Sequence, residues 1–360
     1  MAAQDTDAQA RALCIPTHEL RRAGHTAFSL RQRVASGSLL RLRQGWYIDP
    51  KALEHASDSV KQHAVMLVTH QDASRTPLLS HRSAATVHGF PVWSNWLRTV
   101  GGAASQRVDP LTTHQTVPPG HRSSRTAGVR YAHGTVPHAD IVELGGFRVT
   151  SAERTLIDLA RSEPFELALS CADQYLHETV RVGTQVDFES WSEWRAQMLT
   201  RITPLAGSRG VGRARALVAL ADPRADSPLE TVSRLRFLQN GIDVEPQHPV
   251  RSERGSSYFL DFWLLNQPFF GECDGKVKYT DSRLRGGQSA EQVVYREKLR
   301  QDWVTATTGR RGVRWGAAHV GTGALFARRL RAFGVRIPAQ TRPTRRFGAD
   351  AARVLGTLPE

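Results

Sequence analysis

Two short apolar segments, residues 258–264 and 269–273, carry acidic side chains in stretches that otherwise favour β-strands. Both are rich in aromatic and aliphatic residues and flank an Asn-Gln dipeptide, so they predict the two strands of a β-hairpin. If that dipeptide forms a two-residue turn, Asp261 lies directly opposite Glu272 and both side chains leave the same face of the sheet. Their Cβ atoms would then be roughly 5 Å apart, where like charges repel.

Asp274 follows Glu272 on the same face and adds a third carboxylate. Three carboxylates would destabilise the fold unless a cation or a bound proton compensates them, and their hard oxygen atoms suit Mg²⁺ or Mn²⁺. The chain has 43 arginines and only five lysines, and three of those lysines follow this segment: Lys276, Lys278 and Lys298. Carboxylates beside a lysine amine are the groups used by divalent-metal phosphodiester chemistry. An acidic turn that ends a strand and a one-residue slip in register are the alternatives.

The charge of the chain indicates a polyanionic partner, most simply DNA. The net charge is +14 with an isoelectric point of about 10.6. Six arginines in residues 21–43 and ten in residues 303–349 occur without a single acidic residue. A solvated basic surface would account for either run alone, whereas two such runs favour DNA. The three cysteines lack paired spacing, so neither disulfides nor a zinc site is expected. The absence of a signal peptide and of any membrane-spanning segment predicts a cytoplasmic protein.

Residues 7–50 predict three short helices followed by a small hairpin, which is the order of a winged helix-turn-helix. The third helix would offer Arg31 and Arg33 to a DNA groove, and the wing would offer Arg41 and Arg43 to phosphates. The alternative is a small basic helical domain that binds nothing.

The segment Ser227-Pro228-Leu229-Glu230 has the pattern of a capping box at the start of a helix. Glu230 then has a structural role, and a second role as a further carboxylate near the metal is equally open. A later helix, predicted over 291–304, carries Lys298 and Arg300. These two side chains would either clamp a phosphate backbone or form an exposed helix face with neighbouring acidic residues.

The N-terminal half resembles the AbiEi family of type IV toxin–antitoxin antitoxins. The resemblance is carried, in order, by SGSLLRLRQGWYIDP, LLSHRSAATVHGFPVW and GFRVTSAERTLIDLARS, within residues 7–180. It implies a winged helix followed by a second α/β domain, and a DNA-binding antitoxin that represses its own operon. It also implies a cognate toxin as partner.

Residues 227–320 resemble the Vsr-like branch of the PD-(D/E)xK nucleases, which have the restriction-endonuclease fold. The matching pieces are SPLE, the DF pair at 261–262, GECDGKVKY and EKLRQD. The resemblance implies that Asp261 and Glu272 bind the metal and that Glu230 assists. The chain departs from the family where Asp274 occupies the position of the motif lysine. Lys276 or Lys278 would then take over the role of that lysine.

Together these patterns predict an α/β (α+β multidomain) chain. The expected parts are a winged helix-turn-helix at 1–55, an AbiEi-like α/β domain at 56–200, a linker at 201–226, a nuclease-fold domain at 227–335 and a basic tail at 336–360. Two functions are compatible with this order. One is a DNA-binding protein with a Mg²⁺- or Mn²⁺-dependent endonuclease domain, and the other is a non-catalytic antitoxin and transcriptional repressor. No motif favours a hydrolase of small molecules, and the oligomeric state stays open.

Overall fold

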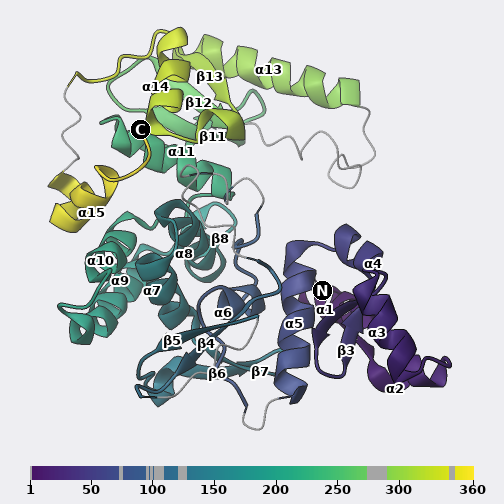
Figure 1. Cartoon of the computed structure of the whole chain (residues 1–360). Coiled ribbons are helices and arrows are strands. Elements are labelled where there is room, and N and C mark those ends of the chain that lie inside the picture. Colours follow the sequence, from purple (N-terminus) through teal and green to yellow (C-terminus); the bar gives the residue numbers. More distant parts are fainter. Residues whose placement is uncertain are drawn as a thin grey trace. The chain divides into compact units, whose positions relative to one another are not determined.

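The computed structural model describes residues 2–72, 76–94, 97, 100, 109–120, 128–273, 290–339 and 345–360. The chain divides into two compact units (Figure 1). The first unit comprises Met1–Trp93 and Gln106–Leu159, and the second comprises Ser94–Ser105 and Ala160–Glu360. Both contain helices and strands, so the mixed α/β class predicted from the sequence is confirmed. Within the described ranges, no helix combines the length and the apolar character that crossing a bilayer requires.

The first unit begins with the expected order of three helices and a hairpin. Its elements are α1 (Ala2–Leu13), β1 (Ile15–Pro16), α2 (Thr17–Arg22), α3 (Ala27–Ala35), β2 (Leu40–Arg43) and β3 (Trp46–Ile48). The Thr26 side chain caps α3 by accepting a hydrogen bond from the Ser29 amide. The strands form a small antiparallel sheet in the order β1-β3-β2, and the buried Leu20, Leu30 and Leu39 fill the space beneath the helices.

The rest of the first unit includes the long helix α5. Its elements are α4 (Pro50–His55), α5 (Asp58–Asp72), α6 (His81–Val87), β4 (Thr113–Val117), β5 (Val129–His133), β6 (Ile141–Leu144), β7 (Phe147–Thr150) and α7 (Ala152–Ser162). Strands β4 and β5 pair in parallel, whereas β6 and β7 form an antiparallel hairpin. A buried cluster joins Met66 of α5 to Phe147 and Val149 of β7. α7 begins in this unit and ends in the second.

The second unit starts with a group of helices that the sequence predicted to lie partly outside the nuclease-fold domain. They are α8 (Phe165–Val180), α9 (Phe188–Ile202), α10 (Val211–Leu220) and α11 (Pro228–Gln239), with the short strands β8 (Arg181–Val182) and β9 (Gln185–Val186) after α8. α8 packs on α11, and α10 packs on α15 (Gly348–Leu355) near the C-terminus.

The structure therefore differs from the domain boundaries predicted around residues 201–226 and 336–360. The first of these segments contains α10, whose Leu217 is fully buried, and the second contains α15, whose Ala351 is fully buried. Both helices carry alanine and aliphatic side chains that bury against each other, because neither can form a core alone. The segment expected to be a linker and the segment expected to be a basic tail both belong to the second unit.

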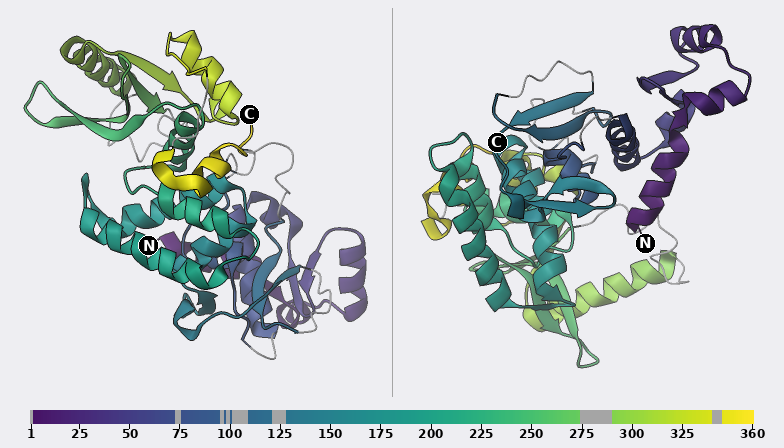
Figure 2. Two further views of the ribbon diagram at one scale, coloured as in Figure 1. Left: turned by 90° about the vertical axis from the view of Figure 1, so that its left-hand side faces the viewer. Right: turned by 90° about the horizontal axis from the view of Figure 1, so that it is seen from below.

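The centre of the second unit is a four-stranded sheet. Its strands are β10 (Val244–Arg251), β11 (Ser257–Leu264), β12 (Phe269–Cys273) and β13 (Arg311–Trp315), in that spatial order. The first three are antiparallel, and β13 runs parallel to β12. α13 (Ala290–Thr308) precedes β13, and α14 (Gly323–Ala332) follows it. In both views of Figure 2 the light-green helix α13 lies beside the green strands of this sheet.

Each face of the sheet contributes to a separate apolar cluster. The larger cluster contains Phe237 of α11, Phe262 of β11, Trp315 of β13 and Phe326 of α14, whose rings contact one another with centroids 4.8 to 5.8 Å apart. A smaller cluster joins Phe270 of β12 to Val304 of α13. These two clusters hold α11, α13 and the strand ends in place around the acidic side chains of the hairpin.

Candidate functional site

The β11–β12 hairpin has the register that the sequence predicted. Phe262 pairs with Gly271 and Trp263 pairs with Phe270, so continuation of the ladder places Asp261 opposite Glu272 on one face. The turn contains Asn266 with a φ of 49°, a left-handed conformation that asparagine tolerates better than most residues.

Asp261 and Glu272 differ in how they are held. An oxygen of Asp261 accepts a hydrogen bond from the Cys273 amide at 2.7 Å, which fixes this half-buried carboxylate against the end of β12. Glu272 is 8 % exposed, and burial, followed by the nearby charge of Asp261, raises the pKa of its carboxyl from 4.5 to about 8. The two side chains therefore repel each other, as the register alone predicts.

Arg300 of α13 provides the main compensation for Glu272. Its Nη2 atom lies 3.1 Å from Glu272 Oε1 and also donates to the Phe259 carbonyl oxygen at 2.6 Å. Its Nη1 atom pairs with Glu297 at 3.3 Å, and Glu297 in turn pairs with Arg314 of β13 at 2.7 Å. The sequence left open a phosphate clamp or a helix face with neighbouring acidic residues for Arg300. Its pair with Glu297 agrees with the second alternative, and its contact with Glu272 was not predicted.

Lys298 occupies a different position on the same helix. Its side chain is exposed to solvent, and it is two residues from Arg300, so the two cations point in different directions from the helix axis. A role for Lys298 at a phosphate backbone therefore stays a prediction. Asp274, Lys276 and Lys278, which the sequence also proposed for the site, lie outside the described residues.

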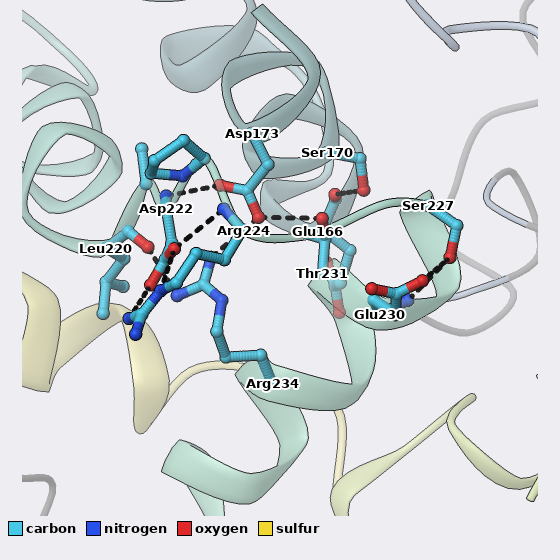
Figure 3. Close-up of polar contacts among 12 residues, drawn as sticks. Glu166, Ser170, Asp173, Leu220, Asp222, Arg224, Ser227, Glu230, Thr231 and Arg234 are labelled. Carbon is cyan, nitrogen blue, oxygen red and sulfur yellow. Dashed lines mark hydrogen bonds and ion pairs between the residues drawn. The ribbon is translucent and has the colours of Figure 1, made fainter. Parts of the chain in front are cut away.

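Glu230 has the structural role expected of it and is also electrostatically close to Asp261. Ser227 caps α11 by accepting from the Glu230 amide at 3.3 Å, and its hydroxyl donates to Glu230 Oε1 at 2.9 Å (Figure 3). Glu230 Oε2 accepts from the Asp226 amide at 2.9 Å. Burial, followed by the charge of Asp261, raises the pKa of the Glu230 carboxyl from 4.5 to about 7. The capping role is therefore confirmed, and a role beside a metal stays a prediction.

Gln247 of β10 was not identified from the sequence. It lies between the pairs Pro246–Phe262 and His248–Leu260, beside Asp261, and has a left-handed φ of 53°. A glutamine in this conformation is strained, and such strain persists only where the surroundings enforce it. Its side-chain amide donates to Glu230 Oε2 at 2.9 Å. The sequence offered only an indirect signal, because the prolines that flank this position are compatible with an irregular edge strand.

The resulting cluster brings three carboxylates close together. The charge of Asp261 raises the pKa of both Glu230 and Glu272, and Arg300 pairs with Glu272. Carboxylate oxygens are the donors that hard divalent cations prefer, and a cation would remove the repulsion that raises the two pKa values. Asp261 and Glu272 lie on one face of the hairpin, and their carboxylate oxygens are suitable ligands for Mg²⁺ or Mn²⁺. Within the described part of the chain, however, no three side chains already form a complete metal cage.

The arginines proposed for DNA binding lie on the two elements expected to carry them. Arg31 and Arg33 are on α3, and Arg41 and Arg43 are on β2. Arg31 and Arg41 are exposed, whereas Arg33 is partly buried and its Nη1 atom lies 3.0 Å from a ring nitrogen of His25.

Comparison with known proteins adds relatives but no activity. No family model matches the chain. Two uncharacterized proteins of Mycobacterium tuberculosis, MT2308 of strain CDC 1551 / Oshkosh and Rv2248 of strain ATCC 25618 / H37Rv, are each 28% identical to it over 145 residues. The match covers 40% of this chain and 48% of each relative, so the chain spans about half the length of the curated relatives it matches.

Proposed function

We propose that this chain is a DNA-binding protein whose second unit hydrolyses phosphodiester bonds with the help of Mg²⁺ or Mn²⁺. The observation that carries the proposal is the hairpin register, which sets Asp261 opposite Glu272 beside a third carboxylate, Glu230. Burial and the charge of Asp261 raise the pKa values of Glu230 and Glu272, and a bound cation would relieve this repulsion.

Asp261 and Glu272 would hold the cation, which when bound supplies Lewis acidity and lowers the pKa of water. Arg300 keeps the Glu272 carboxylate in place through its 3.1 Å contact. Glu230, with a pKa of about 7, can take up or release a proton near neutral pH. Lys276 or Lys278 would provide the positive charge that the nuclease motif assigns to lysine.

The first unit would deliver the duplex to this site. Arg31 and Arg33 of α3 would enter a groove, and Arg41 and Arg43 of β2 would contact phosphates. The net charge of +14 supports a polyanionic partner. A chain with these properties would act in the cytoplasm.

The test is cleavage of supercoiled and linear duplex DNA in the presence of Mg²⁺ or Mn²⁺. Asp261→Asn and Glu272→Gln should each reduce cleavage about 100-fold or more, because each removes a charge that stabilises the reaction. Asp302→Asn is the matched control, since Asp302 is an exposed carboxylate of α13 away from the cluster. Cleavage that persists unchanged in Asp261→Asn, or that the wild-type protein lacks with both metals, would contradict the proposal.

The second candidate is a non-catalytic repressor of the AbiEi antitoxin type. The ion pair between Arg300 and Glu272 favours it, because an arginine then occupies part of the space a cation would use. This function predicts salt-sensitive binding to the chain's own promoter that survives Glu272→Gln. Fluorescence anisotropy should show that Arg31→Ala with Arg41→Ala weakens binding and reduces the salt dependence by about one unit per lost phosphate contact. Arg353→Ala, on the exposed surface of α15, should leave binding unchanged.

A further inference from the structure

A second concave site lies in the second unit, apart from the three carboxylates. It is a cavity of about 590 Å³ that α9, α10, the start of β10 and the 3₁₀ helix η4 (Arg345–Phe347) surround. None of Glu230, Asp261 and Glu272 lines it. Small-molecule sites typically have volumes of about 300–1,000 Å³, so the cavity has the size of a ligand site.

One face of α9 supplies an aromatic and basic wall to this cavity. Phe188, Trp191, Arg195 and Leu199 lie along that face and all line the cavity. Phe188 is 65% exposed and Leu199 is 46% exposed, so apolar surface faces the open space. The guanidinium of Arg195 lies 4.0 Å from the centre of the Trp191 ring, and the Phe188 and Trp191 rings are 6.0 Å apart. The wall therefore offers the exposed ring of Phe188, with Trp191 buried behind it and the cation of Arg195 against the Trp191 ring.

The charges around the cavity are mostly positive and only partly compensated. Its lining contains five arginines, which are Arg195, Arg215, Arg224, Arg234 and Arg346, but only two aspartates, which are Asp222 and Asp243. Arg224 makes two bonds to Asp222, at 2.9 and 2.6 Å, and Arg234 pairs with Asp173 at 2.7 Å (Figure 3).

Arg195 and Arg215 are less well compensated by the described carboxylates. Arg215 is only loosely paired, at 3.7 Å from Asp350, and no carboxylate in the described ranges forms an ion pair with Arg195. Burial lowers the pKa of Arg195, and the nearby Arg234 and Arg224 lower it further, whereas Asp222 acts in the opposite direction. Among the residues that line the cavity, positive charge therefore exceeds negative charge.

Several buried donors in this lining also lack acceptors. The Nε1 atom of Trp191 and the Nε atoms of Arg195 and Arg234 are buried without a hydrogen-bond partner among the described residues. Trp191 is 8% exposed and Arg234 is 5% exposed, so bulk water reaches little of either side chain. Unsatisfied buried donors are rare in native proteins, and an acceptor-rich ligand would remove this cost.

We infer that this cavity binds a nucleoside phosphate, with the base stacked on the exposed ring of Phe188 and the phosphate oxygens on Arg195 and Arg215. Aromatic faces with adjacent guanidinium groups are the combination that recognises unpaired nucleotides, because the rings stack on bases and the cations pair with phosphate. A free mononucleotide and an unpaired nucleotide of a DNA strand share this chemistry. The inference is independent of the proposed cleavage activity, since no metal-binding candidate residue is involved.

The test is titration calorimetry of the full chain in EDTA with deoxyadenosine monophosphate, deoxyadenosine, inorganic phosphate and a short single-stranded oligodeoxynucleotide. The monophosphate should bind at least about tenfold more tightly than deoxyadenosine or phosphate alone, because both parts of the ligand are recognised. Arg195→Gln should weaken its binding about tenfold or more, and Phe188→Ala about fivefold or more. The exposed positions of α15 and β8 provide matched controls, Arg353→Gln and Val182→Ala, which should bind as the wild type does.

Phe188 is mostly exposed, so its substitution tests stacking without a risk to the core. Binding of the monophosphate identifies a free nucleotide as the source, and binding of the oligonucleotide alone, with the same dependence on Arg195 and Phe188, identifies a DNA strand. No binding of either ligand would overturn the inference. Equal binding of phosphate and nucleotide, with no effect of Phe188→Ala, would also overturn it. Asp261→Asn should bind the nucleotide normally, so a failed cleavage assay and a failed binding assay are separate results.

Discussion

Helix α11 borders two groups of buried charges that are balanced in opposite ways. On one side Arg234 pairs with Asp173 at 2.7 Å and Arg236 pairs with Glu166 at 2.8 Å, so each carboxylate has its own guanidinium. At its N-terminus Glu230 instead lies near Asp261, whose charge raises the pKa of both Glu230 and Glu272.

The difference shows that burial of charge does not by itself indicate function. In the paired group each carboxylate has a guanidinium partner, and Asp173 also accepts hydrogen bonds from Thr231 and from the Asp222 amide, each at 2.8 Å. The carboxylate cluster keeps a repulsion that the fold does not remove, and Gln247 adds backbone strain beside it. Mutual repulsion among these carboxylates is the feature that calls for a ligand.

The largest effect is expected where a balanced pair is broken. Arg236→Met leaves the Glu166 carboxylate buried without its partner and should lower the free energy of unfolding by about 3–5 kcal/mol. The double substitution Arg236→Met with Glu166→Leu should recover most of that loss, because an apolar pair needs no compensation. Urea denaturation measures both values. If Arg236→Met lowers the free energy of unfolding by less than about 1 kcal/mol, the Arg236 guanidinium does not compensate the buried Glu166 carboxylate.

Substitution of Glu272 in the carboxylate cluster should raise the free energy of unfolding, whereas breaking the pair of Arg236 and Glu166 lowers it. In the folded chain the pKa of Glu272 is about 8 instead of 4.5, so between these values the folded state holds a proton that the unfolded chain has released. The stability of the metal-free wild-type protein should therefore decrease as the pH rises from about 5 to about 8.

Glu272→Gln should flatten that pH profile and raise the unfolding free energy at pH 8 by on the order of 1–2 kcal/mol. Thermal unfolding in EDTA at a series of pH values measures this, with Asp302→Asn as the control that keeps the wild-type slope. If the stability of Glu272→Gln falls with pH as steeply as that of the wild type, the carboxylates of the cluster do not repel each other as proposed.

Loss of the N-terminal cap of α11 should lower the stability of the protein moderately. Ser227→Ala removes the acceptor for the Glu230 amide and the donor to its carboxylate, and should cost about 1 kcal/mol of stability. Ser227→Thr retains the hydroxyl and should stay close to the wild type in chemical denaturation. Equal losses in the two variants would mean that the cap does not depend on the hydroxyl.

The smallest effect on stability is expected at Lys298. Its side chain is exposed on α13, so Lys298→Ala should change the unfolding free energy by less than about 0.5 kcal/mol. If Lys298 contacts a phosphate, the same variant should reduce the salt dependence of DNA binding by about one unit. Arg300→Ala is the comparison, because loss of its contact with Glu272 should lower stability clearly. Similar losses in both variants would place Lys298 in the cluster as well.

Local patterns predicted the parts of the fold that depend on neighbours in sequence. The hairpin register follows from a short turn between two apolar strands, and the start of α11 follows from the serine and glutamate of its capping box. The order of helices and hairpin at the N-terminus follows from periodicity in the same way. The extent of the second unit did not follow, because the packing of α10 on α15 joins segments more than a hundred residues apart.

For the candidate site, the sequence by itself determined which carboxylates share a face, because side chains alternate strictly along paired strands. Only the tertiary structure decided how their charges are balanced. Arg300, Gln247 and Glu230 come from α13, β10 and α11, and their contacts depend on how these elements pack around the sheet. The basic cavity was likewise invisible in the sequence, because its lining comes from segments that meet only in the folded unit. Periodicity reports the face of one element, whereas the balance of charge depends on every element that reaches that face.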